Sequence, residues 1–353
     1  MTNVVLITGV SRYLGARLAA HLALDPSVER IIGVDAVPPR PADLARLGRT
    51  EFMRADIRNP LIAKVIAQAQ VDTVVHASVL APRGGGGGRA TAQDQHVTGT
   101  MQLLAACQKS ESVRHVVVKS TTAVYGCGPS DPAVFTEQMQ ALGRARGGYA
   151  REAVEVEDYV RGFGRRRPDI SVTVLRFANL IGPTIDTALT RYLAMPIVPT
   201  SLGFDPRLQL LHESDAVAVL RQATVTPVPG VVNVAGEGVV SLSQAVRRVG
   251  RLRLPVPAPA IALVGGAVRN AGVVEFSAEQ ASFLNFGRVV DTTRLRTQFG
   301  YLPRYTTAQA LRSYADDRPA TPRPGAFVVR RAERRLQQRT ARMLAAAEPS
   351  EVS

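Results

Sequence analysis

Short apolar runs alternate with longer amphipathic stretches through the first 180 residues. The run from Val4 to Thr8 ends at a glycine turn. Apolar residues then recur at the spacing of one helix face, at Leu14, Leu18, Ala19 and Leu22. Five more apolar runs follow at helix-length intervals: Ile31 to Asp35, Phe52 to Asp56, Thr73 to Ala77, His115 to Ser120 and Val172 to Phe177. Six strands that alternate with helices predict an α/β fold with a doubly wound parallel sheet.

The pattern becomes irregular after Pro183. Five prolines interrupt residues 196–229, and residues 254–259 read LPVPAP. We therefore expect residues 1–183 to form mainly the sheet domain and residues 184–317 mainly a smaller, partly helical lobe. Five consecutive glycines at 84–88 predict a mobile loop, because glycine loses the most conformational freedom when it is ordered.

The segment 318–353 has the features of a linker followed by a basic helix. It opens with prolines at 319, 322 and 324 and contains 8 arginines and 3 glutamates. Within residues 327–347, Val329, Ala332, Leu336 and Met343 share one helix face, and arginines surround the rest. We expect an Arg-rich tail helix. It docks on its own domain, frays, or binds a membrane surface or a partner protein.

Composition narrows the class of protein. The 353 residues include 43 basic and 29 acidic side chains, and only Lys64, Lys109 and Lys119 are lysines. Arginine-rich, Trp-free composition is what a GC-rich coding bias produces, so the net charge of +14 does not by itself indicate a nucleic-acid partner, and we expect none. Cys107 and Cys127 lack the spacing of a disulfide framework or a zinc site.

The compartment follows from the same features. The few cysteines indicate a reducing environment, and the N-terminus runs straight into an apolar strand without a basic lead or a cleavage site. No run of about 18 apolar residues marks a membrane span. We expect a soluble cytoplasmic protein without a bound metal.

A candidate nucleotide-binding loop lies between the first strand and the first helix. Residues 8–15 read TGVSRYLG, in the position where a dinucleotide pyrophosphate binds backbone N–H groups at a helix N-terminus. Asp35 ends the second strand, where a carboxylate accepts hydrogen bonds from an adenosine ribose and repels a 2′-phosphate. The pattern therefore favours NAD over NADP.

A series of ordered motifs resembles the NAD-dependent epimerase/dehydratase family of the extended short-chain dehydrogenase/reductases, over residues 3–317. The motifs are TGxxGxxG at Thr8, Gly9 and Gly15, Asp56-Ile57, His76-Ala77-Ser78, residues 96–100 (HVTGT), 120–126 (STTAVYG), 176–183 (RFANLIGP) and 210–216 (LLHESDA). The resemblance implies a Rossmann-like fold, a C-terminal substrate lobe and NAD as cofactor. The implied cofactor-binding residues are Gly9, Ser11, Arg12, Tyr13, Leu14, Gly15, Asp35, Asp56, Ile57, His76 and Ala77.

The resemblance also implies a catalytic pair and two substrate-binding residues. In the family a tyrosine acts as acid/base, helped by a serine or threonine and by a lysine four residues after the tyrosine. Tyr149 and Thr121 match the first two, and Arg176 and Asn179 match substrate-side positions. His76, His212 and His96, which stands where the family has asparagine, are expected to be structural.

Two departures from the family pattern bear on function. Arg12 replaces the middle glycine of the loop, where a side chain threatens the closest phosphate contact or adds a charged one. Ala153 replaces the lysine, and a free phenol with a pKa of about 10 is ionised at pH 7 in only about one molecule in a thousand. Lys119 shares a strand face with Thr121 and is the candidate substitute, the alternative being a lysine that meets solvent or a helix.

Three functions remain open at this stage. The first is a nucleotide-sugar epimerase/dehydratase of the UDP-glucose 4-epimerase type, an isomerase that works by oxidoreduction. The second is a catalytically silent dinucleotide-binding sensor or scaffold, and the third is an NADPH-dependent reductase with Arg12 on the 2′-phosphate. A homodimer is a further expectation.

Overall fold

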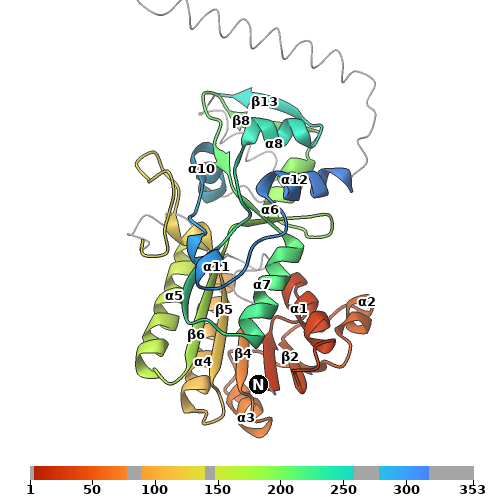
Figure 1. Ribbon diagram of the computed structural model, residues 1–353, viewed down its shortest axis with the longest axis vertical. Coiled ribbons are helices and arrows are strands. Elements are labelled where there is room, and N and C mark those ends of the chain that lie inside the picture. Colours follow the sequence, from red (N-terminus) through yellow and green to blue (C-terminus); the bar gives the residue numbers. More distant parts are fainter. Residues whose placement is uncertain (1–3, 78–88, 140–147, 258–277, 318–353) are drawn as a thin grey trace, which may run out of the picture.

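Seven parallel strands form the central sheet, in the order β11-β6-β5-β4-β1-β2-β3 (Figure 1). The computed structural model describes residues 4–77, 89–139, 148–257 and 278–317. The strands of this sheet are β1 (Val4–Thr8), β2 (Arg30–Asp35), β3 (Glu51–Arg54), β4 (Thr73–His76), β5 (His115–Thr121), β6 (Ser171–Phe177) and β11 (Gly230–Val234). The chain reverses direction of travel across the sheet beside β1. This makes it doubly wound, as predicted.

The six strands predicted from the apolar runs are all present, with bounds that shift by at most two residues. The seventh strand, β11, was not predicted. It follows two prolines and lies in the stretch expected to belong mainly to the smaller lobe. Its five residues have the burial of a covered strand only because they pair with β6, from Gly230 opposite Thr173 to Val234 opposite Phe177.

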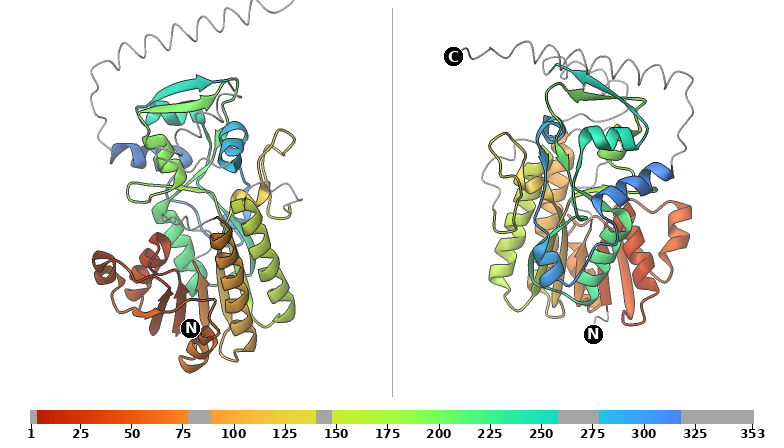
Figure 2. Two further views of the ribbon diagram at one scale, coloured as in Figure 1. Left: turned by 180° about the vertical axis from the view of Figure 1, so that it is seen from behind. Right: turned by 45° about the horizontal axis from the view of Figure 1, so that its top comes forward.

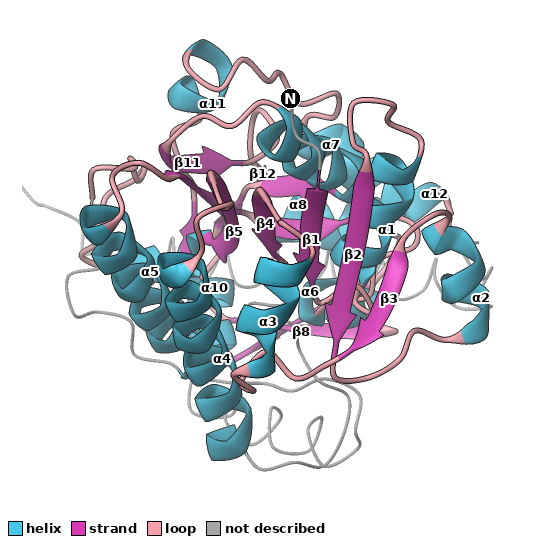
Figure 3. Ribbon diagram, turned by 90° about the horizontal axis from the view of Figure 1, so that it is seen from below, coloured by secondary structure: helices cyan, strands magenta, loops and turns pink. Residues whose placement is uncertain are grey.

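Helices cover both faces of the sheet (Figure 3). On one face, α4 packs against both α3 and α5, and on the other face α1 packs against α7. The predicted apolar positions of α1 are all buried in this layer. The helices of this unit are α1 (Tyr13–Ala23), α2 (Pro41–Leu44), α3 (Leu61–Gln68), α4 (Arg89–Lys109), α5 (Gly148–Arg166), α7 (Glu213–Val225) and α11 (Thr293–Thr297), with 3-10 turns η1 (Ala45–Leu47) and η2 (Thr122–Tyr125).

A smaller lobe with its own apolar core lies beyond the carboxyl ends of the strands (Figure 2). Its largest buried side chains include Tyr192 and Tyr314. Its strands are β7 (Asn179–Ile181), β8 (Ile197–Ser201), β9 (Arg207–Leu208), β10 (Leu210–His212), β12 (Val240–Ser241), β13 (Leu252–Val256) and β14 (Gly287–Arg288). Its helices are α6 (Ala188–Ala194), α8 (Leu242–Arg248), α10 (Ala278–Phe286) and α12 (Thr307–Asp316).

The chain passes between the two cores more than once. After the first lobe elements it returns to the sheet domain as α7 and β11, and Val290, Leu295 and Phe299 later join the sheet-domain core as well. Residues 184–317 are therefore divided between both units. The glycine run 84–88 and the tail 318–353 lie outside the described residues, so the predictions for them stay predictions.

Candidate functional site

Two glycines shape the turn between β1 and α1. Gly9 has a positive φ of 75° and its N–H donates to the carbonyl oxygen of Val34 over 2.8 Å. A Cβ on Gly15 would lie 2.2 Å from the carbonyl oxygen of Gly9, far inside contact distance. Only glycine allows the first turn of α1 to approach the loop this closely. The two family glycines that the chain keeps are therefore the two that the backbone requires.

Arg12 occupies an ordinary backbone conformation. It is the N-cap of α1, with φ −95° and ψ 157°, and its side chain makes no capping hydrogen bond. Any residue adopts this extended conformation, so the loop folds without the glycine that the family has here. The N-terminus of the 11-residue helix α1, where N–H groups lack partners within the helix, still follows the loop as a dinucleotide phosphate would require.

A pocket opens between this loop and the ends of β2 and β3, and we call it the loop pocket. It brings together residues from four segments: Gly9, Arg12, Val34, Asp35, Ala36, Ala55, Asp56, Ile57, Arg58 and His96. Five of them were predicted as cofactor-binding residues from separate motifs. Their convergence gives a site with a helix N-terminus and acidic side chains, which is the donor and acceptor set that the phosphates and ribose of a dinucleotide require.

Asp35 is held in place by the glycine-loop backbone. Its carboxylate accepts from the N–H of Ser11 over 3.3 Å and from the N–H of Val37 over 3.1 Å, while the Ser11 hydroxyl donates to the Val37 carbonyl oxygen. Asp56 forms an ion pair with Arg58 at the other side of the pocket, at 2.5 Å. Leu14 and Ala77, also predicted here, are buried in the core and support the loop from below.

Tyr13 links the loop to the smaller lobe. Its hydroxyl lies 2.7 Å from Oγ1 of Thr184, and burial raises the pKa of this phenol to about 12. The buried carboxylate of Glu213 accepts from the Thr184 hydroxyl and from the N–H groups of Thr184 and Ile185. This linkage joins the start of α1 to the start of α7 through Thr184, which follows β7 of the smaller lobe.

His76 lies in a hydrogen-bond chain beneath the loop. The Thr100 hydroxyl donates to the carbonyl oxygen of His96 over 2.7 Å, so it accepts from Nε2 of His76 at 2.9 Å. Nδ1 of His76 then accepts from the hydroxyl of Thr8 at 2.7 Å. Burial lowers the pKa of His76 to about 3, which keeps the imidazole neutral. His76 supports the loop through Thr8 rather than facing the pocket.

This neutral histidine makes stability depend on pH. The folded state depresses the pKa of His76 from 6.5 to about 3. The contribution of the neutral imidazole to the free energy of unfolding is therefore full above about pH 6.5 and is lost as the pH falls toward 3. Between about pH 6 and pH 4 we expect the free energy of unfolding of the wild type to fall by about 1.4 kcal/mol per pH unit more than that of His76→Gln. Urea unfolding of both proteins at several pH values measures this difference, and parallel slopes would contradict it.

Thr121 and Tyr149 come from neighbouring elements. Thr121 ends β5, and its side chain accepts from the N–H of Ala123 at the start of η2. Tyr149 lies in the first turn of α5, which packs against η2, and 39% of it is exposed. Both residues therefore lie beyond the carboxyl end of the sheet, on the side of the loop.

The position of the family lysine is filled by a core residue. Ala153 is 1% exposed and packs within the sheet-domain core. Lys119 lies on β5, two residues before Thr121, and is 9% exposed. Burial lowers the pKa of its ammonium group to about 8, and its charge is close enough to His76 to help lower the pKa of that imidazole. Lys119 is thus a buried cation at the end of the strand that carries Thr121.

The guanidinium of Arg176 is buried in the sheet domain. It is 3% exposed, and its Nε and Nη2 bond both carboxylate oxygens of Glu157 on α5. Its Nη1 donates to the hydroxyl of Tyr125 at 2.8 Å. The structure places this predicted substrate-binding residue in a buried ion pair between β6 and α5, and its role toward a substrate stays a prediction. Asn179 begins β7 in the smaller lobe, opposite Leu210.

One polar pair in this region was not predicted from the sequence. Nδ1 of His96, on α4, bonds Oε1 of Glu152 on α5. Glu152 comes three residues after Tyr149, which puts the two on one helix face. A glutamate among the apolar positions of a helix was a sequence signal for a buried polar contact, but its partner is 56 residues away and the pattern does not name it.

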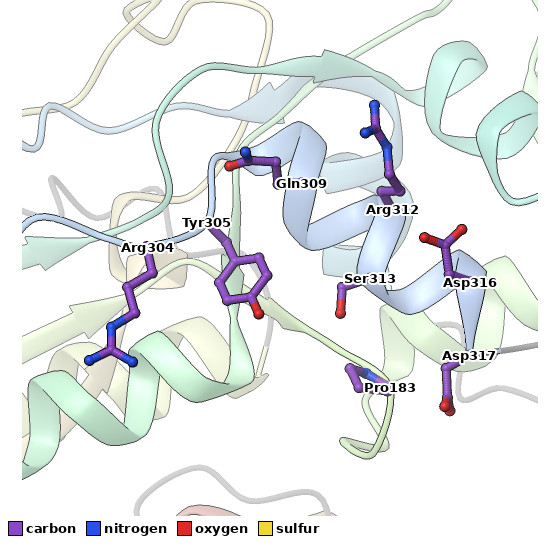
Figure 4. Close-up of a pocket in the computed structure, with 8 residues that line it drawn as sticks. All are labelled: Pro183, Arg304, Tyr305, Gln309, Arg312, Ser313, Asp316 and Asp317. Atoms are coloured by element: carbon purple, nitrogen blue, oxygen red, sulfur yellow. The ribbon is translucent and has the colours of Figure 1, made fainter.

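A second hollow, the lobe pocket, lies on the smaller lobe beside α12 (Figure 4). It was not predicted. In the close-up, Tyr305 and Ser313 point toward its centre, above Pro183 of the RFANLIGP motif. His212 contacts two of the lining residues: its ring stacks on that of Tyr305 with centroids 3.8 Å apart, and its Nε2 bonds Oγ of Ser313. The lining residues are Pro183, Arg304, Tyr305, Gln309, Arg312, Ser313, Asp316 and Asp317.

Comparison with known proteins gives relatives at two levels of sequence identity. An uncharacterised protein of Mycobacterium tuberculosis is 49% identical over 320 residues, which cover 91% of this chain and 85% of the relative. A UDP-glucose 4-epimerase of Pasteurella multocida is 26% identical over 187 residues, which cover 50% of this chain and 53% of the relative. No helix within the described residues has the length and apolar character needed to cross a membrane.

Solved structures share the fold. A dTDP-glucose 4,6-dehydratase from Bacillus anthracis in complex with NAD superposes with a TM-score of 0.68 at 18% identity, covering 89% of this chain and 96% of that one. A UDP-glucose 4-epimerase from Thermotoga maritima with UDP-glucose gives a TM-score of 0.65 at 17% identity, covering 89% and 98%. The model of the NAD dependent epimerase/dehydratase family matches residues 5–235, more than half of the chain. The glycine loop, the doubly wound sheet and this match together show that the chain belongs to the NAD-dependent epimerase/dehydratase family.

Proposed function

We propose that this protein is an NAD-dependent nucleotide-sugar 4-epimerase that acts on a UDP-hexose. The observation that carries the proposal is the position of Tyr149, an exposed tyrosine in the first turn of α5. Helix α5 packs against the turn η2, and Thr121 is the residue that caps the start of η2. NAD, when bound, accepts a hydride from the sugar carbon and returns it. UDP-sugar relatives and neighbours support this choice of substrate class.

In this proposal the chain contributes proton transfer and orientation. The Tyr149 phenolate takes the proton of the sugar hydroxyl to become the phenol and later gives that proton back, while the Thr121 hydroxyl holds the same sugar oxygen in line. A nearby cation has to lower the pKa of this phenol, because the free phenol, with a pKa of about 10, is almost entirely protonated at pH 7. Each unit by which the pKa falls corresponds to about 1.36 kcal/mol. We assign this role to Lys119, whose ammonium is charged below about pH 8.

The test is exchange at the 4-position of the sugar. Purified protein is first analysed for bound NAD and titrated with NAD and NADP, and exchange between UDP-glucose and UDP-galactose is then followed by NMR. We expect Tyr149→Phe to lower the exchange rate by at least about 100-fold, the lower range for a lost acid/base group. Tyr159→Phe, farther along α5, is the matched control and should retain the rate.

Lysine variants separate the proposed function from its alternatives. We expect Lys119→Met to lose most of the exchange rate and Lys109→Met, at the exposed end of α4, to keep it. Bound NAD with no exchange of UDP-sugars would instead support the silent sensor or scaffold, which the alanine at position 153 favours. Tighter binding of NADP than of NAD would support the reductase and contradict the role of Asp35.

A further inference from the structure

A buried ion pair connects the loop pocket to the helix that carries Tyr149. His96 on α4 and Glu152 on α5 bond through Nδ1 and Oε1, and their side chains are only 14% and 10% exposed. His96 is also one of the residues that line the loop pocket, together with Arg12 and Asp35. One histidine therefore contacts a carboxylate on one side and borders the proposed cofactor site on the other.

The hydrogen bond to Glu152 determines what the other ring nitrogen can do. A carboxylate only accepts, so Nδ1 of His96 carries a proton in either charge state. In the neutral ring Nε2 is an acceptor, whereas in the imidazolium Nε2 donates as well. Within the described residues, Nε2 has no hydrogen-bond partner in the protein. A partner of anionic character in the pocket, added to the Glu152 carboxylate, favours the imidazolium.

Several elements in the described part of the chain bring charged or titratable groups near His96. Glu152 lies on α5, and neutral His76 lies on β4, where the charge of His96 helps to lower the pKa of His76. Arg12 of the glycine loop, Asp35 of β2, and the Asp56–Arg58 pair after β3 share the pocket. A phosphate bound in this pocket screens the charges of Arg12 and His96 from each other.

We propose that His96, oriented by Glu152, donates through Nε2 to a phosphate oxygen of the bound dinucleotide, so that cofactor binding is coupled to the uptake of a proton. Glu152 is a positioning residue in this arrangement. The inference rests on the proposed function only for the identity of the cofactor. The contact from His96 on α4 also adds to the phosphate contacts of the glycine loop, which has lost one of the family's glycines.

Calorimetry of NAD binding in two buffers of different ionisation enthalpy tests the proposal. The wild type is expected to take up a substantial fraction of a proton per NAD at about pH 7, and its affinity for NAD to fall at least about fivefold between pH 6 and pH 8, the range in which histidine changes charge. Adenosine, which lacks phosphate, should bind without proton uptake. His21→Asn, on the exposed C-terminal end of α1, should behave as the wild type.

Two variants identify the source of the proton. His96→Asn, which restores the family residue, and Glu152→Gln are expected to abolish proton uptake and to flatten the pH dependence of NAD affinity. If the pair only joins α4 to α5, both variants lower the melting temperature while proton uptake on NAD binding stays at the wild-type value, and the proposal is wrong. Absence of proton uptake or of NAD binding in the wild type overturns it as well. Proton uptake without sugar exchange would overturn the proposed function and leave this inference standing.

Discussion

Arg176→Met is expected to lower the free energy of unfolding by about 3–5 kcal/mol, because it leaves the Glu157 carboxylate buried without its partner. Both side chains are about 95% buried or more, and Nε of Arg176 lies 3.0 Å from Oε1 of Glu157. Ser120 also donates to this carboxylate, but a single hydroxyl does not neutralise its charge. The free energy of unfolding lost in Arg176→Met therefore exceeds the net stabilisation that the ion pair itself provides.

Urea unfolding of three variants measures this loss. Arg161→Met removes an exposed ion pair with Asp158 on the same helix and should cost less than about 1 kcal/mol. The double variant Arg176→Met with Glu157→Leu should recover most of the stability, because no charge is then left buried. If Arg176→Met is as mild as Arg161→Met, the guanidinium is not held by Glu157 and the substrate-binding role that the resemblance implied is open again.

Gly15→Ala is expected to destabilise the protein by about 1–3 kcal/mol and to weaken NAD binding at least tenfold. The added Cβ would lie 2.2 Å from the Gly9 carbonyl oxygen, a backbone atom that cannot rotate away. The loop must therefore move away from the start of α1, and the N–H groups that would hold the phosphates move with it. Thermal unfolding and an NAD titration measure the two effects.

Gly164→Ala in α5 is the matched control. There the Cβ meets Val172 Cγ2 at 3.8 Å, an ordinary contact, so the change should be neutral or stabilise the helix by up to about 1 kcal/mol. Wild-type NAD affinity in Gly15→Ala would contradict the proposed cofactor site at this loop. Such a result would leave the family membership of the fold intact.

Local sequence patterns were sufficient for much of the sheet domain. The run Val4 to Thr8 became β1 with the predicted bounds, and Leu14 and Leu18 of the following helix are buried. These elements follow from hydrophobic periodicity, which depends on a residue's neighbours in the chain. Strand β11 was missed because its five residues carry no period of their own. Pairing with β6 makes them a strand.

The candidate site likewise depends partly on local sequence patterns and partly on contacts between distant segments. Gly9, Gly15 and Asp35 were predicted from the glycine turn and the end of the following strand, because a dinucleotide loop is a local structure, and Gly9 and Asp35 line the loop pocket. The roles of Arg176 and His96 depended on partners that come from other elements of the sequence, Glu157 and Glu152. The electrostatics of a buried side chain depend on which charges the fold brings within a few ångströms. The sequence by itself therefore determined the fold class and predicted the loop for the cofactor, and only the tertiary structure decided which polar residues line the pocket and which are paired beneath it, because those pairs join elements far apart in the chain.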